Sequence, residues 1–173
     1  DVTFGGGGHS RAILEKLTSG RLIAFDQDTD AAANALRDER FTLLGQNFRY
    51  LKNNLRYIGI DTIDGLIADL GVSFHQFDEQ ERGFSFRGDA ELDMRMNRQS
   101  PVKASDILRT YDEEKLADIF YNYGELTTSR KLAAAIVKSR ASKPVAMVSD
   151  LPAALEGLVP PREENKFWAR LFQ

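Results

Sequence analysis

The sequence contains no cysteine among its 173 residues and only two histidines, His9 and His75. Without cysteine the chain can form no disulfide and no thiolate metal site, and two isolated histidines do not suggest zinc ligation. No apolar run approaches the roughly 20 residues that a membrane-spanning helix requires, and the first residues show no signal-peptide pattern. We therefore expect a cytoplasmic protein with no metal site and no membrane partner, whose cofactor, if it has one, is organic.

Positive charge is also scarce, since 23 Lys and Arg stand against 26 Asp and Glu and the formal net charge is −3. This balance argues against a protein that coats nucleic acid without selectivity, because neutralising phosphates requires clustered basic residues. Residues 126–143 depart from it, since they carry no acid and the following basic side chains: Arg130, Lys131, Lys138, Arg140 and Lys143. One face of this segment could contact phosphates, although a solvated helix face is the more common explanation.

Helical and extended patterns alternate through the first part of the chain, after a run of glycines at 5–8. In order, the patterns predict a helix at 9–17, a strand at 21–26, a helix at 30–37, a strand at 41–44, a helix at 48–57 and a strand at 62–69. Strands that alternate with helices imply right-handed crossovers and a parallel sheet. The first part of the chain is therefore predicted to be an α/β layer.

The pattern changes after Gly71. Residues 72–104 combine glycines, arginines and aromatics without a clear period, which is typical of a long ordered loop with a functional role. Beyond them the pattern is helical, with helices expected to begin at Asp112, at Thr128 or Ser129, and at Ser149. An all-helical lobe is therefore predicted beside the α/β layer.

The glycines at 5–8 open a helix, and such a loop lets the backbone approach a ligand closely because no Cβ stands in the way. A P-loop is excluded, since no Gly-Lys-Ser/Thr follows, but dinucleotide enzymes, methyltransferases and a plain flexible turn stay open. Asp26 ends the next strand about 20 residues on, where a carboxylate can accept hydrogen bonds from a ribose hydroxyl pair. A helix cap is the alternative for Asp26, although Asp28 and Asp30 are better placed for that role.

Asp69 ends the predicted strand at 62–69, which puts a second carboxylate at the carboxyl edge of the sheet. Such an acid could accept a hydrogen bond from a substrate amine. The lone pair of an exocyclic pyrimidine amine is delocalised into the ring, so an acceptor that takes up its proton would promote attack on a sulfonium methyl group. A solvated strand-end carboxylate is the alternative.

Several motifs follow one another along the chain: DVTFGGGGHS at 1–10, FDQD at 25–28, DGLIADLGVS at 64–73, ERGFSFR at 81–87 and LDMRM at 92–96. In order and spacing they resemble the ribosomal RNA small-subunit methyltransferase H family along essentially the whole chain. The resemblance implies S-adenosyl-L-methionine as the methyl donor and the N4 amino group of a cytosine in 16S ribosomal RNA as the acceptor, within the small ribosomal subunit. It leaves a homo-oligomer open.

The resemblance also implies a fold. We expect a Rossmann-like methyltransferase sheet with an inserted all-helical lobe. The expected division is a cofactor-binding α/β part at 1–76, a connecting loop and helical insertion at 77–165, and the start of a return to the methyltransferase part at 166–173. The family's sheet is expected to extend beyond both ends of this chain.

Carried over position by position, the resemblance gives these cofactor-binding residues: Gly7, Gly8, His9, Asp26, Phe48, Asp69 and Gln76. Asp69 is also the candidate catalytic residue. Phe48 could pack on a purine face or be a core aromatic, and His9 could instead cap a helix. The role of Gln76 rests almost wholly on the resemblance.

Arginines alternate with aromatic side chains in the long loop, a combination that suits stacking and phosphate contact with an unpaired nucleotide. Neighbouring acids could instead pair with these arginines and order the loop. The candidate RNA-binding residues are Arg82, Arg87, Arg95, Arg130 and Lys131.

The sequence departs from the family pattern at two places. Phe74 occupies a position where serine is usual and could reshape the cytosine entrance, and Gly45-Gln46-Asn47 replaces histidine-glycine-asparagine. Three alternatives therefore stay open: a nonenzymatic RNA- or ribosome-binding module on the methyltransferase fold, a chain that is inactive by itself, and an NAD-dependent oxidoreductase. The oxidoreductase shares the glycine turn and Asp26 but does not explain the arginine-aromatic loop.

Overall fold

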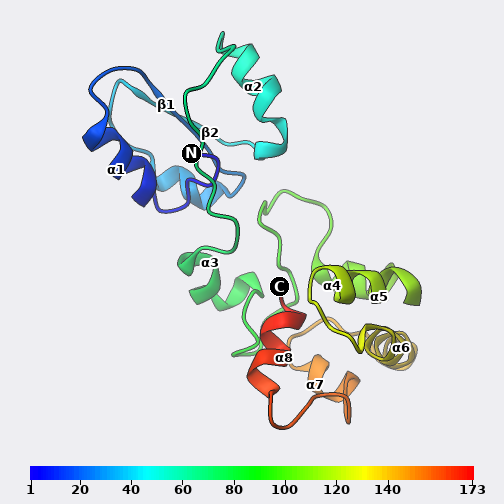
Figure 1. The fold of residues 1–173 in the computed structure, drawn as a ribbon. Coiled ribbons are helices and arrows are strands. Elements are labelled where there is room, and N and C mark those ends of the chain that lie inside the picture. Colours follow the sequence, from blue (N-terminus) through cyan, green and yellow to red (C-terminus); the bar gives the residue numbers. More distant parts are fainter. The chain divides into compact units, whose positions relative to one another are not determined.

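The computed structural model describes residues 1–173, which form two compact units (Figure 1). The first unit comprises Asp1–Ser73 and Met96–Gln99, and the second comprises Phe74–Arg95 and Ser100–Gln173. The first unit mixes strands and helices, and the second is helical apart from one isolated β-bridge. No helix in the chain combines the length and the apolar character that crossing a membrane would require.

The sheet of the first unit consists of two parallel strands, β1 (Leu22–Phe25) and β2 (Phe41–Leu44). In the register, Leu22 lies opposite Phe41 and Phe25 lies opposite Leu44. Burial on both faces explains the uninterrupted apolar sequence of β1, where Ala24 and Phe25 have no exposed surface. The parallel pairing confirms the predicted strands at 21–26 and 41–44.

Residues 1–4 run along the other side of β1. The Asp1 nitrogen donates to the Ile23 carbonyl at 3.0 Å, and the Phe25 nitrogen donates to the Asp1 carbonyl at 2.9 Å. On their far side, the Val2 nitrogen donates to the Ile67 carbonyl at 2.9 Å. This segment therefore lies between β1 and the residues near Ile67, and it leads directly into the glycine loop.

The strand predicted at 62–69 is wrong as a regular strand, because residues 62–69 adopt no strand conformation. Within residues 1–173, Ile63 and Leu66 are 49% and 55% exposed, and the following Leu70 is 71% exposed. Burial against neighbours is what stabilises an apolar strand, and residues 1–173 do not supply it here. The segment is extended but is held to residues 1–4 by few hydrogen bonds.

The helices of the first unit are α1 (Gly8–Lys16) and α2 (Leu51–Tyr57), and α2 is preceded by the 3-10 turn η2 (Phe48–Tyr50). Both agree with the predicted helices. The helix predicted at 30–37 is instead a 3-10 helix, η1 (Thr29–Asn34). Its alanine-rich sequence offers no apolar stripe to stabilise an α-helix, and Ala31 is its buried residue.

The sheet separates two small apolar clusters. Phe25 packs with Val2 and Leu55 on one face, whereas Ala24 packs with Phe4 on the other. Alternate strand residues point to opposite faces, which accounts for the division. The first unit therefore has two small cores, one on each face of the sheet.

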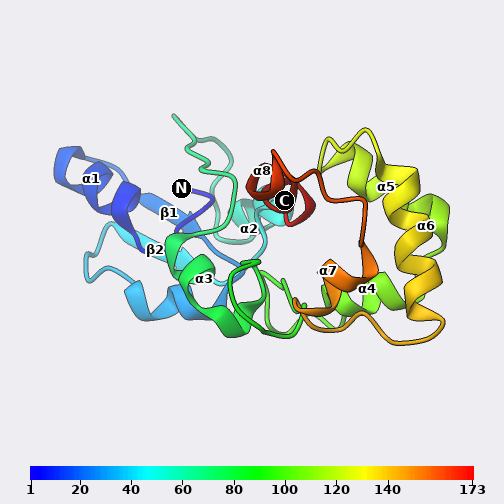
Figure 2. The same ribbon diagram turned by 90° about the horizontal axis from the view of Figure 1, so that it is seen from below.

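The second unit is built around α5 (Glu113–Asn122) and α6 (Ser129–Arg140), which pack side by side (Figure 2). The other helices are α3 (Phe74–Asp78), η3 (Gln80–Arg82), α4 (Ala104–Thr110), α7 (Asp150–Ala154) and α8 (Glu164–Leu171). The three helices predicted after residue 104 are α5, α6 and α7. Asp112 caps α5 as predicted, since its carboxylate accepts from the Lys115 nitrogen at 2.8 Å.

One apolar core joins the helices of the second unit. Leu116, Leu132, Ile136 and Leu155 have no exposed surface in it. Residues 166–171 belong to α8, whose Phe167 and Trp168 are buried in this core. The predicted divisions at residues 76 and 165, and the predicted return to the methyltransferase part, stay predictions.

The long loop is ordered, as the sequence indicated. The Leu92 nitrogen donates to the Ala146 carbonyl and the Val148 nitrogen to the Ala90 carbonyl, both at 2.8 Å. Gly83 adopts a left-handed φ of 70°, and a Cβ there would overlap the Glu91 carbonyl oxygen. The glycine is therefore required by both the backbone conformation and the close approach of a second segment.

Candidate functional site

The glycine loop joins residues 1–4 to α1. Gly7 has a left-handed φ of 77°, and its nitrogen donates to the Phe4 carbonyl at 2.8 Å. A Cβ on Gly7 would lie 2.9 Å from Cζ of Phe4, a ring that is itself buried. Cβ atoms on Gly6 and Gly8 would meet nothing within 4 Å. The loop thus folds tightly at Gly7 and presents open backbone on either side of it.

Asp26 lies at the carboxyl end of β1 and is bound to the glycine loop. Its Oδ2 accepts from the Gly5 nitrogen at 2.7 Å, and its Oδ1 accepts from the Asp28 nitrogen at 2.9 Å. A carboxylate oxygen has two lone pairs, so each oxygen keeps the capacity to accept from a ligand hydroxyl. The structure therefore brings Asp26 and the glycine loop together, with the Asp26 carboxylate bound to the backbone of the loop.

The residues of η1 support this arrangement. Asp28 caps η1 by accepting from the Asp30 nitrogen at 3.1 Å, as predicted for Asp28. The Asn34 side-chain nitrogen donates to the Gly5 carbonyl at 3.1 Å. Asn34 was missed in the sequence, because an asparagine at the end of an alanine-rich segment carries no recognisable pattern.

Phe48 begins η2, which three residues separate from the end of β2, and is 42% exposed, so its ring is not part of the core of residues 1–173. The preceding Asn47 fixes the turn, since its Oδ1 accepts from the Arg49 nitrogen at 2.8 Å and its Nδ2 donates to Oε1 of Gln27 at 2.8 Å. This side-chain bond links the ends of β1 and β2. His9 is the exposed second residue of α1 and not its cap.

Asp69 is exposed, and its backbone nitrogen donates to Oγ1 of Thr3 at 2.8 Å. Thr3 belongs to a second group of polar residues that sequence reasoning missed. The buried Asp1 carboxylate accepts from the Thr3 nitrogen at 3.1 Å and from Oγ of Ser10 at 2.8 Å. The motif at 1–10 contained this signal, since it places three polar side chains around an otherwise glycine-rich turn.

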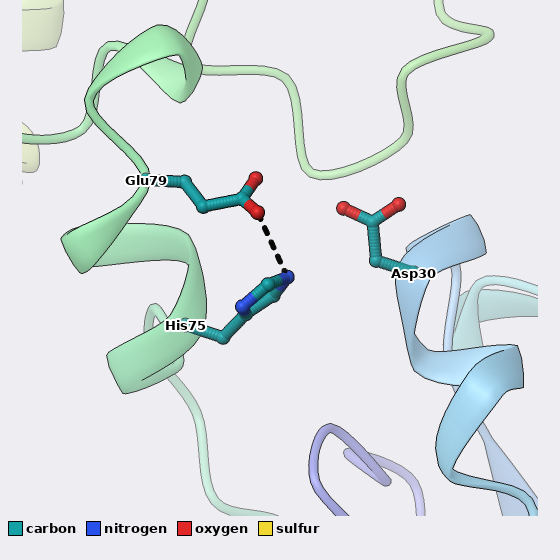
Figure 3. A group of neighbouring side chains, drawn as sticks. All are labelled: Asp30, His75 and Glu79. Atoms are coloured by element: carbon teal, nitrogen blue, oxygen red, sulfur yellow. Dashed lines mark ion pairs between the residues drawn. The ribbon is translucent and has the colours of Figure 1, made fainter.

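Gln76 belongs to the second unit, where it is a buried residue of α3. Nε2 of His75 in α3 lies 3.5 Å from Oε1 of Glu79, which directly follows this helix; Figure 3 draws this i,i+4 pair. Phe74 begins α3 and is 90% exposed, so its ring fills no cavity. The cofactor role of Gln76 stays a prediction.

The loop arginines differ in their surroundings. Arg82 is 3% exposed and donates to the Arg95 carbonyl at 2.9 Å. Arg95 donates to both carboxylate oxygens of Asp93 at 2.7 Å, and this hydrogen bonding lowers the pKa of Asp93. The two arginines therefore help to order the loop in this structure, which is the alternative that the sequence left open, and their role as RNA contacts stays a prediction. Arg87 is exposed, with its guanidinium 6.0 Å from the centroid of the Phe86 ring.

Residues 1–173 match the model of the MraW methylase family. The chain belongs to the MraW methylase family. This match confirms the resemblance drawn from the motifs. The relatives of this MraW-family chain include proteins named ribosomal RNA small subunit methyltransferase H. That of Phocaeicola vulgatus is 53% identical over 174 residues, that of Porphyromonas gingivalis 56% over 177, and that of Flavobacterium johnsoniae 51% over 174.

Each of these alignments covers the whole of the MraW-family chain. The chain in turn spans 57% of the Phocaeicola and Porphyromonas relatives and 58% of the Flavobacterium relative. The glycine loop, Asp26, Phe48 and Asp69 therefore lie in the first unit of a methylase-family chain.

Proposed function

We propose that this chain is the donor-binding and helical part of an S-adenosyl-L-methionine-dependent methyltransferase that modifies the N4 amino group of a cytosine in 16S ribosomal RNA. The observation that carries the proposal is the match of the whole chain to the methylase family and to relatives named for small-subunit ribosomal RNA methylation. Its substrate would place the enzyme in the cytoplasm, acting on the small ribosomal subunit.

The first unit fits the proposed donor. Gly7 forms a tight turn that a Cβ would block, and the glycines beside it leave the backbone open to a ligand. Asp26, held by two backbone nitrogens, is ready to accept hydrogen bonds from ribose hydroxyls. Phe48 offers an exposed ring for a purine. In the first unit we assign donor binding to Gly7, Gly8, His9, Asp26, Phe48 and Asp69. Gln76, in the second unit, is proposed from the resemblance alone.

The donor supplies an electrophilic methyl group on a sulfonium sulfur. The protein's part is to orient the acceptor nitrogen toward that methyl group, since correct placement supplies much of the rate of such a transfer. We assign Asp69 to accept a hydrogen bond from the cytosine amine, which helps the nitrogen rehybridise and takes up its proton. Its exposed carboxylate is accessible for this role.

We also propose a Rossmann-like layout for the sheet. The hydrogen bonds run from β2 to β1, from β1 to residues 1–4, and from residues 1–4 to the segment near Ile67. In chain order this is the 3-2-1-4 arrangement of a doubly wound sheet, in which ligands bind at the carboxyl ends of the strands where the order reverses. We propose that the second unit is the inserted helical lobe.

For RNA contact we propose Arg82, Arg87, Arg95, Arg130 and Lys131, of which Arg87, Arg130 and Lys131 are exposed. Arg87 lies beside an aromatic ring, the pairing that suits an unpaired nucleotide. Arg130 and Lys131 lie in the first turn of α6. The target cytosine must be unpaired or flipped for its amine to reach a site.

Calorimetric titration tests the donor site. The full-length protein should bind S-adenosyl-L-methionine and not NAD, and Asp26→Ala should weaken binding by at least about tenfold, the loss expected for hydrogen bonds to a charged group. Asp64→Ala, at an exposed acid of the same unit, is the matched control. Tight NAD binding would instead identify an oxidoreductase.

Methyl transfer is then measured with radiolabelled donor, using 16S RNA and small subunits as alternative acceptors. We expect label on a cytosine N4 and its loss in Asp69→Ala. Donor binding without transfer to either acceptor would contradict the enzymatic proposal and favour a nonenzymatic RNA-binding module.

A further inference from the structure

Within residues 1–173, the segment that carries Asp69 makes few contacts with the rest of the first unit. Its apolar neighbours Leu66 and Leu70 are 55% and 71% exposed, and Asp69 itself is exposed. One backbone hydrogen bond, from Val2 to Ile67, ties the segment to the middle of the unit. The contact at Asp69 is a second hydrogen bond between this segment and residues 1–4.

That contact comes from a side chain. In a regular parallel ladder, the nitrogen of Asp69 would donate to a backbone carbonyl of the neighbouring strand. Here it donates to the hydroxyl oxygen of Thr3 at 2.8 Å, across 66 positions of sequence. Thr3 lies two residues before Gly5, so one hydroxyl group connects Asp69 to the start of the glycine loop.

The hydroxyl group is itself held in place. The Thr3 nitrogen donates to the carboxylate of Asp1, which is 8% exposed, and this carboxylate also accepts from Ser10, which has no exposed surface. Ser10 belongs to α1, so the network fixes Thr3 relative to the first helix. A β-branched side chain has few accessible rotamers, which restricts the hydroxyl further.

We infer that Thr3 is a positioning residue, whose hydroxyl group holds Asp69 in register with the glycine loop. The inference rests on the proposed function, in which Asp69 accepts from the cytosine amine. Small displacements of a group in a transfer reaction lower the rate strongly, even where binding is kept. The network of Ser10, Asp1 and Thr3 thus links the donor loop to the acceptor side of the site.

The test is Thr3→Val in the full-length protein, which keeps the shape of the side chain and removes the hydrogen-bond acceptor. We expect kcat to fall about fivefold to tenfold, the effect of one hydrogen bond, and the Kd of the donor to rise by a smaller factor, since Asp69 is one of several residues assigned to donor binding. Thr3→Ser, which keeps the hydroxyl, should restore kcat. Thr42→Val, at an exposed position of β2, is the matched control.

Hydrogen–deuterium exchange gives a readout that does not depend on activity. The Asp69 amide should exchange faster in Thr3→Val than in the wild type, Thr3→Ser or Thr42→Val. An enzyme that methylates RNA but shows unchanged kcat and unchanged exchange in Thr3→Val would overturn the inference. A joint fall of kcat, donor affinity and Tm that serine does not restore would also overturn it, since that result indicates a structural role.

Separate measurements test the proposed methyl transfer and the proposed role of Thr3. If the wild-type protein transfers no methyl group, the proposed function is wrong, and the exchange rate of the Asp69 amide still decides whether Thr3 holds the segment.

Discussion

Replacing Gly7 by alanine is the sharpest test of the glycine loop. The left-handed φ of 77° costs an L-residue about 1–2 kcal/mol. The new Cβ would also lie 2.9 Å from Cζ of Phe4, whose ring is 3% exposed and has little room to move. Overpacking of this kind costs about 1–3 kcal/mol. Together the two effects predict a loss of about 2–5 kcal/mol in the free energy of unfolding.

Urea unfolding of Gly7→Ala measures this loss, and Gly6→Ala is its matched control. Gly6 is the neighbouring residue, it has no left-handed φ, and a Cβ there would meet nothing within 4 Å. We expect Gly6→Ala to stay within about 0.5 kcal/mol of the wild type, as exposed substitutions usually do. Equal effects of the two substitutions would refute the account of the loop given above, because they would show that neither φ nor the Phe4 ring constrains Gly7.

Three further changes test other parts of the chain. Gly83→Ala should lower Tm by several degrees, because its Cβ would overlap a backbone carbonyl oxygen that cannot move aside; an unchanged Tm would contradict the described packing of the loop. Hydrogen bonds from Arg40 lower the pKa of Asp38 to about 2, so the stability that this pair contributes is present above the ordinary carboxyl pKa and is lost as the pH falls toward 2. Arg40→Ala should therefore flatten the dependence of unfolding free energy on pH between about 4 and 2, and parallel curves for the two proteins would exclude this assignment. Replacing both Arg130 and Lys131 by glutamate should weaken RNA binding. It should also reduce the slope of log affinity against log salt concentration by the contribution of about two phosphate contacts, while donor affinity, the control, stays unchanged. An unchanged slope would show that these residues do not contact the RNA.

Much of the helical unit could be predicted, because its signals are local and repeated. The stripe of Leu116 and Phe120 and the Asp112 cap define α5 from one short stretch of sequence. The capping residue and the apolar stripe predict the same helix, so local propensity and packing favour the same structure. The same holds for α6 with Leu132 and Ile136.

The predictions for two elements of the first unit failed for physical reasons. Residues 62–69 have a strand's sequence, but their apolar side chains lie in solvent and no regular ladder forms. Residues 30–37 have good helix formers but no stripe to bury, so η1 replaces an α-helix there. In both cases tertiary contacts, which a local pattern does not contain, decide the outcome.

The candidate site was predicted in part. Asp26 and the glycines were found because strand ends and glycine turns have fixed chemical uses. The hydrogen bonds of Asn34, Asn47 and Thr3 were not, because each joins residues far apart in sequence. The burial of Arg82 likewise depends on the fold and not on the arginine-aromatic pattern around it.

The first unit is not a continuous stretch of sequence. Residues 96–99 belong to it, although the loop residues before and after them belong to the second unit. Within the first unit, Nη2 of Arg98 lies 3.4 Å from Oδ2 of Asp30 in η1. A fragment ending at residue 73 would therefore lack one of its own ion pairs, and a protease that cuts near the exposed Arg87 would leave residues 96–99 attached to the helical fragment. Dissecting this protein into separately expressed parts calls for a circular permutation or a linker that keeps residues 96–99 with the first unit, and not for a single cut.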